Sequence, residues 1–187
     1  MTEKDFIPSD FSDLPENGSI TWKAPSNIAL VKYWGKRGNQ IPANPSLSFT
    51  LDASATTTTL YFSKKADSKD ISFEVRLDGE AKPDFAPKLQ TLCERVEAYL
   101  PFLRSYHFTI DTSNSFPHSS GIASSASGMA ALSLCLLDLE RQFSDMDADY
   151  FDKKASFLAR LGSGSACRSI KGRMVQWGSH PSMIEST

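Results

Sequence analysis

The chain has 187 residues, of which 40% are hydrophobic and 22% are charged, and its net charge is −2. This composition is typical of a soluble globular protein with one sizeable core. The sequence contains no dense block of Lys or Arg, which argues against nucleic acid as a partner. Its longest apolar stretch, around residues 129–139, is too short to cross a bilayer, so we expect no membrane association.

The three cysteines are odd in number and widely spaced. This pattern fits a reducing compartment and predicts neither a disulfide framework nor a zinc site. The first residues lack the apolar core of a signal peptide. We therefore expect a cytoplasmic protein.

Residues 1–18 are polar and are interrupted by prolines and a glycine, which predicts a flexible N-terminal arm. We expect one domain over residues 19–187. Its first strand is predicted over residues 19–23.

Residues 24–37 form an unusual segment in which Lys32 and Lys36 stand beside Tyr33 and Trp34. A lysine ammonium is a compact charge that suits a phosphate or a carboxylate, and a tyrosine can donate a phenolic hydrogen bond. The simpler interpretation is a strand with an exposed end, and the segment taken alone favours that interpretation.

The middle of the chain alternates between strand and helix patterns. Strands are predicted over residues 46–51, 55–63, 71–77 and 106–111, with a hairpin turn at Asp78-Gly79. Apolar residues at spacings of three and four predict an amphipathic helix that ends before a proline. Its inward-facing residues are Phe85, Leu89, Leu92, Val96 and Tyr99.

Residues 116–131 open as a loop of small residues and continue as an apolar helix. From Ser119 to Gly128 only Ile122 is larger than serine. Small residues let backbone N–H groups approach a ligand, and a helix N-terminus attracts negative charge, so this stretch predicts a phosphate site. The other interpretation is a serine-rich, well-capped start of a core helix. A Walker A loop is excluded, because no Gly-Lys-Ser/Thr closes the stretch.

A mostly apolar and central helix is predicted over residues 122–143. Asp147 can cap a further helix that runs through Leu161. Residues 162–169 then form a second turn of small residues, with serine hydroxyls and the planar guanidinium of Arg168, which suits a carboxylate or phosphate. Alone, this could be an interhelix turn with a surface arginine. A last strand is predicted over residues 173–177, which gives about six strands and three helices in an α+β arrangement.

Three stretches now stand together: Ala-Pro-Ser-Asn-Ile-Ala-Leu-Val-Lys-Tyr-Trp-Gly-Lys-Arg (24–37), Phe-Pro-His-Ser-Ser-Gly-Ile-Ala-Ser-Ser-Ala-Ser-Gly (116–128) and Ala-Arg-Leu-Gly-Ser-Gly-Ser-Ala-Cys-Arg-Ser (159–169). In this order they closely resemble the mevalonate diphosphate decarboxylase family of the GHMP kinase superfamily. The resemblance covers residues 19–178. It implies an α+β fold of the ribosomal protein S5 domain 2-like type, with a mixed or antiparallel sheet and helices packed on one side.

The resemblance also implies a lyase of isoprenoid biosynthesis that uses ATP and Mg²⁺. The family phosphorylates the 3-hydroxyl of mevalonate 5-diphosphate, and loss of that phosphate together with CO₂ gives isopentenyl diphosphate. Such a site works mainly by holding anions in register. The implied partners are mevalonate 5-diphosphate, ATP and, as a homodimer, a second copy of the chain.

Site residues follow from the same resemblance. Arg168 is expected to grip the substrate carboxylate, Asn27 to orient Arg168, and Lys32 to organise the polar centre near the reacting hydroxyl. Substrate binding is implied for Tyr33, Trp34, Gly35 and Lys36, with Tyr33 and Lys36 on the diphosphate, and for Ser163, Gly164, Ser165, Ala166, Cys167 and Arg168. ATP binding is implied for Ser120, Gly121, Ala123, Ser124 and Ser125, and Mg²⁺ binding for Ser125.

Two departures from the family pattern qualify these implications. Many relatives carry Asn-Gly-Arg where this chain has Asp78-Gly79-Glu80, so a basic residue is lost. Family members are also longer, and their catalytic aspartate lies in a C-terminal domain beyond this chain, so we expect an inactive N-terminal fragment. Alternatives remain a 3-kinase or a monophosphate decarboxylase acting on mevalonate or mevalonate 5-phosphate, and a non-catalytic half-domain that binds nucleotide or diphosphate.

Overall fold

The computed structural model describes residues 2–8, 13–67, 69–117 and 120–178. Its main sheet has the strand order β1-β4-β7-β5-β6, and β8 pairs with β4. These strands are β1 (Asn17–Val31), β4 (Ser46–Lys64), β5 (Ser72–Leu77), β6 (Glu80–Ala81), β7 (Tyr106–Asn114) and β8 (Met174–Trp177). Only β5 and β7 run parallel among these pairs, so the sheet is mixed, as expected.

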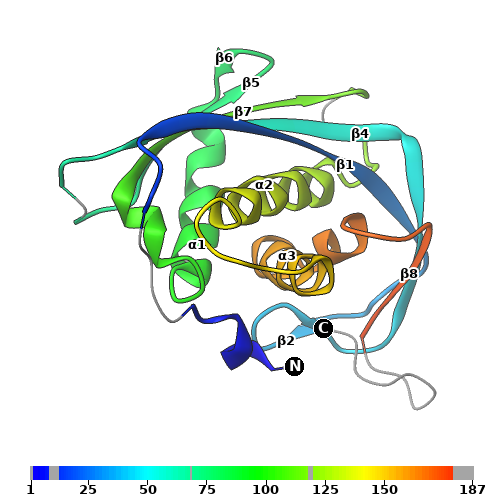
Figure 1. Cartoon of the computed structure of the whole chain (residues 1–187). Helices are drawn as coiled ribbons and strands as arrows, with labels where there is room; N and C mark the ends of the chain where they lie inside the picture. Colours follow the sequence, from blue (N-terminus) through cyan, green and yellow to red (C-terminus); the bar gives the residue numbers. More distant parts are fainter. Residues whose placement is uncertain (1, 9–12, 68, 118–119, 179–187) are drawn as a thin grey trace.

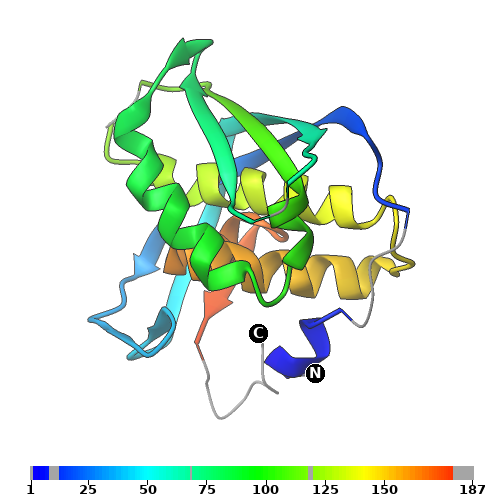
Figure 2. The ribbon, with the colours of Figure 1, turned by 90° about the vertical axis from the view of Figure 1, so that its left-hand side faces the viewer.

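A separate antiparallel pair, β2 (Lys36–Arg37) and β3 (Ile41–Pro42), three α-helices and four short 3₁₀ turns complete the described part of the chain. The helices are α1 (Ala86–Val96), α2 (Ser124–Glu140) and α3 (Ala148–Gly162), with η1 (Glu3–Phe6), η2 (Pro83–Phe85), η3 (Pro101–Ser105) and η4 (Gly164–Ser169). Figures 1 and 2 show the α-helices together on one face of the sheet. This confirms the α+β fold. No described helix combines the length and the apolar character that crossing a membrane requires.

The core lies between the sheet and helix α2. Along β4 every second side chain points inward, so Leu60 is fully buried while the neighbouring Tyr61 is 48% exposed. Of the 17 residues of α2, 13 are buried, on nearly all sides of the helix. A helix that is apolar all round belongs inside a protein. Its predicted central position is therefore confirmed, with the sheet on one side and α3 on the other (Figure 1).

A bend in the sheet positions the candidate site. The strands predicted over 46–51 and 55–63 are in fact one strand, β4, which runs through both. Its pairing with β1 shifts register between Pro25 and Ser26, which leaves residues 52–54 without a partner in β1. Such an irregularity bends a strand. Beyond it, β1 and β4 turn down past the helices, and β8 joins β4 there, on the right of Figure 1.

The N-terminal residues differ from the expected flexible arm. Residues of η1 form a turn, and the side chain of Phe6 is fully buried against the rings of Tyr150 and Phe157, with centroid distances of 5.8 and 5.0 Å. An aromatic ring can cover more core surface than its polar neighbours in the sequence suggest. The domain range 19–187 stays a prediction, because its last nine residues lie outside the described ones and β1 begins at Asn17.

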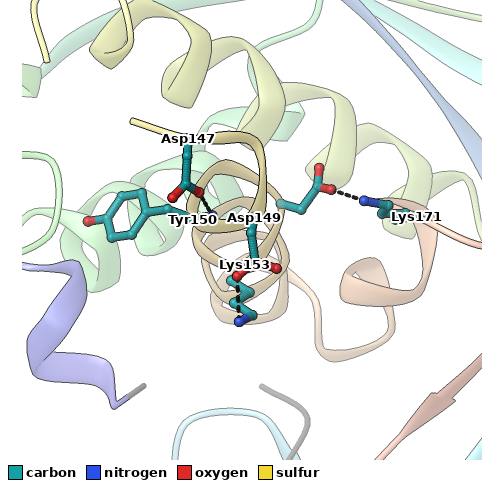
Figure 3. Close-up of polar contacts among 6 residues, drawn as sticks. Asp147, Asp149, Tyr150, Lys153 and Lys171 are labelled. Carbon is teal, nitrogen blue, oxygen red and sulfur yellow. Dashed lines mark hydrogen bonds and ion pairs between the residues drawn. The ribbon is translucent and has the colours of Figure 1, made fainter. Parts of the chain in front are cut away.

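The predicted helix starts and ends are correct to within a few residues. Asp147 caps α3, since its Oδ1 accepts a hydrogen bond from the Tyr150 N–H at 2.7 Å (Figure 3). Lys153 pairs with Asp149 one turn away on the same helix. The hairpin predicted at Asp78-Gly79 is also present, with positive φ at both residues.

An ion pair between Glu140 of α2 and Lys154 of α3 lies wholly inside the protein. The Lys154 Nζ donates to Glu140 Oε1 at 2.6 Å, and both side chains are at most 2% exposed. Burial raises the pKa of Glu140 and lowers the pKa of Lys154, against their mutual attraction. The cost of removing both groups from water therefore outweighs their attraction. The pair connects α2 and α3, but it stabilises their contact no more than an apolar contact would.

Replacing one member of this pair leaves the other charge buried without a partner. We expect Lys154→Met to lower the free energy of unfolding by about 3–5 kcal/mol. The double variant Glu140→Leu with Lys154→Met should return to within about 1 kcal/mol of the wild type or exceed it, measured by urea denaturation. A double variant less stable than the single one would contradict this explanation.

Candidate functional site

Arg168, on η4, lies beneath the bent part of the sheet and is only 4% exposed. Its Nη1 donates to the Ser46 hydroxyl of β4 at 2.6 Å, and its guanidinium carbon lies 5.5 Å from the centre of the Trp177 ring system. Burial lowers the pKa of the guanidinium. No carboxylate pairs with it within the described residues. The sequence could suggest a surface arginine, whereas the structure holds a desolvated cation beside a neutral hydroxyl.

Tyr33 packs against Trp177, and Lys36 lies beside Tyr33. The rings of Tyr33 and Trp177 meet edge to face, with centroids 4.7 Å apart, and the Lys36 Nζ is 5.7 Å from the centre of the Tyr33 ring. That ammonium donates to Gln40 Oε1 at 2.6 Å, which is again a neutral partner. The structure therefore brings Tyr33, Lys36 and Arg168 to one place, although they are far apart in the sequence.

The expected role of Asn27 in orienting Arg168 stays a prediction, and the structure shows no direct hydrogen bond between the two among the described residues. The Asn27 amide nitrogen instead donates to the Ser169 hydroxyl at 2.7 Å and to the Ser165 carbonyl at 3.3 Å. Its Oδ1, the atom that would accept from Arg168, has no partner. Asn27 belongs to β1, so these bonds fasten η4 to the sheet and position Arg168 only indirectly.

Unpaired polar atoms gather at this place. Five buried side-chain N or O atoms have no hydrogen-bond partner in the described part of the chain, and three of them are Asn27 Oδ1, Arg168 Nε and Trp177 Nε1. Each such atom costs about 1–3 kcal/mol when it stays unpaired. Buried polar groups without partners therefore require an explanation, and a polar ligand would satisfy them.

A cavity of about 370 Å³ opens at the start of α2. Apolar side chains of β5, β7 and α1 form much of its wall, and Ser124, Ser125 and Lys88 lie at its polar side. The Lys88 Nζ donates to the Ser125 hydroxyl. The helix itself has Ala123 at its N-cap with a φ of 60° and no side-chain cap, so the well-capped interpretation is wrong. The Ala126 N–H donates to the Ala123 carbonyl, and the N–H groups of Ser124 and Ser125 have no partner among the described residues.

Three cations connect the two places. Burial lowers the pKa of Lys36, and the charge of Arg95 lowers it further. Burial also lowers the pKa of Lys88, and there the second cause is the charge of Lys36. Arg95 is held by the Leu161 carbonyl, to which its Nη1 donates at 2.8 Å. None of the ion pairs among described residues includes these three side chains, so they attract anions jointly.

Several of the residues implied by the resemblance keep their substrate roles as predictions. Lys32 and Trp34 are exposed, and Trp34 reaches 85% exposure. Cys167 is buried, its thiol lies 3.1 Å from the Gly164 carbonyl, and burial raises its pKa to about 12, so it supports η4 and is not a reactive group. Other members stay predictions on position alone; they are Gly35, Ser120, Gly121, Ser163, Ser165 and Ala166.

Sequence reasoning missed Ser46, Lys88, Arg95 and Trp177. Lys88 and Arg95 lie on the polar side of α1, where basic residues are ordinary. Ser46 and Trp177 carry no local pattern that separates them from other strand residues. Their importance arises from contacts between distant segments.

Comparison with known proteins gives a consistent result. A family model described as "Diphosphomevalonate decarboxylase-like N-terminal domain" matches residues 24–186. The diphosphomevalonate decarboxylase of Bos taurus is 38% identical over 175 residues, which are 84% of this chain and 40% of that protein. The Homo sapiens protein of the same name is 35% identical over 175 residues, 85% of this chain and 40% of that protein.

Solved structures agree with this match. The mevalonate diphosphate decarboxylase from Staphylococcus aureus superposes with a TM-score of 0.71 at 34% identity, over 87% of this chain and 46% of that one. A structure described as "MDDEF in complex with MVAPP, AMPPCP and Magnesium" gives a TM-score of 0.68 at 36% identity, over 86% and 46%. This chain thus spans about 40% of the length of the curated relatives it matches.

Removing the charge of Arg95 should change the titration of Lys36. A neighbouring cation disfavours the protonated amine, so Arg95→Gln raises the pKa of Lys36. Anion affinity that depends on Lys36 is present below this pKa and is lost as the pH rises through it, so the variant retains that affinity to higher pH. An NMR titration of the Lys36 side-chain resonances measures the shift, with Lys171, paired to Asp152, as an internal reference. A midpoint that is unchanged or lower would contradict the proximity of Arg95 to Lys36.

Proposed function

Because the chain belongs to the diphosphomevalonate decarboxylase-like N-terminal domain family, we propose that it supplies the N-terminal part of an ATP-dependent decarboxylase acting on mevalonate 5-diphosphate. The product of that reaction is isopentenyl diphosphate, a precursor of isoprenoids. The neighbour described as a complex with "MVAPP, AMPPCP and Magnesium" supports this choice of ligands.

One observation carries the proposal: Arg168 is a buried cation without a carboxylate partner, and its own Nε, Asn27 Oδ1 and Trp177 Nε1 are unpaired among the described residues. Mevalonate 5-diphosphate has a carboxylate at one end and a diphosphate at the other. The carboxylate fits the free donors of Arg168. The diphosphate fits Tyr33, which packs against Trp177, and Lys36, which lies beside Tyr33.

The residues at the start of α2 fit a nucleotide. The largely apolar cavity suits a base, and the uncapped helix start with Ser124, Ser125 and Lys88 suits the phosphates. ATP bound there would supply the phosphoryl group. Among the described residues, no three His, Cys, Asp or Glu side chains converge on a metal position. We therefore propose that Mg²⁺ is held by Ser125 together with phosphate oxygens and water.

The chain's own residues then act by positioning and by electrostatics. Lys36, Lys88 and Arg95 would draw the diphosphate and the nucleotide phosphates together and offset their repulsion. Arg168 would hold the carboxylate in line for the loss of CO₂ as the 3-phosphate departs. No carboxylate side chain of the described residues contacts Arg168, Tyr33 or Lys36. We propose that the group that takes the hydroxyl proton comes from the longer part found in relatives.

Two other functions remain candidates. A 3-kinase or a monophosphate decarboxylase would use mevalonate or mevalonate 5-phosphate, but the joint presence of Tyr33 and Lys36 favours the diphosphate. A non-catalytic half-domain that binds nucleotide or diphosphate is favoured by the lack of a carboxylate near Arg168 within the described residues. A calorimetric panel of mevalonate, its 5-phosphate and its 5-diphosphate separates these functions. A cytoplasmic location and a homodimer stay predictions.

Replacing Arg168 should remove the carboxylate grip without unfolding the chain. We expect Arg168→Gln to weaken the binding of mevalonate 5-diphosphate at least about tenfold, because a charge-assisted bidentate contact is lost. Calorimetry on the 187-residue chain measures this, and Arg104→Gln, which breaks a surface pair with Glu97, is the matched control. Equal affinity in wild type and Arg168→Gln would remove Arg168 from the site. The unmodified chain should release little or no CO₂ from mevalonate 5-diphosphate and ATP, and robust release would contradict the missing proton acceptor.

Replacing Lys88 should weaken nucleotide binding much more than substrate binding. We expect Lys88→Gln to weaken the binding of AMPPCP with Mg²⁺ about tenfold, since one charge-assisted contact to phosphate is lost, while mevalonate 5-diphosphate binds within about twofold of the wild type. Lys153→Gln on the outer face of α3 is the control (Figure 3). If the nucleotide affinity of Lys88→Gln matched the control, the cavity at α2 would not be the phosphate site.

A further inference from the structure

We propose that Trp177 is the positioning residue that keeps Arg168, which binds the carboxylate, and Tyr33, which binds the diphosphate, at a fixed separation. The inference rests on the proposed function for the identity of the ligand, and it adds a residue that the sequence motifs do not contain. Trp177 is the last residue of β8 and is only 3% exposed, so its indole lies in the protein interior.

The indole contacts both Arg168 and Tyr33. The guanidinium of Arg168 lies over its ring at 5.5 Å, a distance at which a cation is attracted to an aromatic face. The ring of Tyr33 meets it edge to face at an interplanar angle of 77°. A movement of the indole would therefore shift Arg168 and Tyr33 together.

The strand register explains why Arg168 is held at this place. Trp177 of β8 lies directly opposite Ser46 of β4 in the antiparallel pair, so both side chains leave the same face of the sheet. The Arg168 guanidinium donates to the Ser46 hydroxyl and lies over the Trp177 ring. A single cross-strand pair thus fixes its guanidinium from two directions and leaves its other donors for a ligand.

Gly164 shows how tightly the Trp177 indole packs against η4. A Cβ at Gly164 would lie 2.6 Å from Cη2 and 2.7 Å from Cζ2 of Trp177, and 3.2 Å from Cε of Lys36. The position accepts only a residue without a side chain, because any larger residue displaces the indole or the backbone. The first residue of η4 therefore lies close to both the Trp177 indole and the Cε of Lys36.

The inference is tested first without ligand, on the isotope-labelled 187-residue chain. In the wild type the ring current of Trp177 should shift the Arg168 side-chain protons in NMR spectra. We expect this shift to be lost in Trp177→Leu and largely kept in Trp177→Phe, which retains an aromatic face. Gly164→Ala provides a second variant that moves the indole without removing it, and it should also change the shift. Arg168 resonances that are identical in the wild type, Trp177→Leu and Gly164→Ala would overturn the proposal.

Binding of mevalonate 5-diphosphate by calorimetry provides the second readout. Trp177→Leu should bind about tenfold more weakly and Trp177→Phe within about threefold, while the affinity for AMPPCP with Mg²⁺ stays unchanged in both. Trp22→Leu is the matched control, because Trp22 contacts Phe151 and Asp138 at the other end of α2. A Phe variant as weak as the Leu variant would overturn the stacking role. A wild-type chain that binds no mevalonate 5-diphosphate would contradict the proposed function, and the NMR comparison would still decide the role of Trp177.

Discussion

The site depends on one interaction, the burial of the Arg168 guanidinium between the Ser46 hydroxyl and the Trp177 ring. A charge taken out of water without an opposite charge is costly, and its pKa is lowered accordingly. A fold can retain such a group when an anion supplies the missing partner. Asn27 and Trp177 also have unpaired buried atoms, so the same region is suited to bind a polar ligand.

The bent sheet and the start of α2 form the surroundings of Arg168. The register shift after Pro25 bends β1 and β4 over η4, and β8 adds the strand that brings in Trp177. The α2 start approaches from the other side, fastened where the Ser26 hydroxyl donates to the Ile122 carbonyl. Lys36 belongs to one site and Lys88 to the other, and Arg95 acts electrostatically on Lys36, so a substrate and a nucleotide, both anionic, would be drawn to adjoining positions.

The sequence predicted most of the fold, because strand alternation and helix spacing are local properties. It placed Asp147 at a helix cap and the core face of α1 correctly. It divided β4 into two strands, since a register shift depends on the partner strand and leaves no local pattern. It did not identify Ser165 and Ser169 as the partners of Asn27, and it missed Trp177, whose role arises only where β8 meets β4. Residue types predict which chemistry is available, whereas long-range pairing decides which groups meet.

The most direct test of the account is a crystal structure of the chain with mevalonate 5-diphosphate and AMPPCP with Mg²⁺. We predict that the substrate carboxylate accepts hydrogen bonds from Arg168, that its diphosphate contacts Tyr33 and Lys36, and that the nucleotide phosphates lie at Ser125 and Lys88. A substrate bound with its carboxylate away from Arg168, while that guanidinium stays buried against Ser46 and Trp177, would contradict the account.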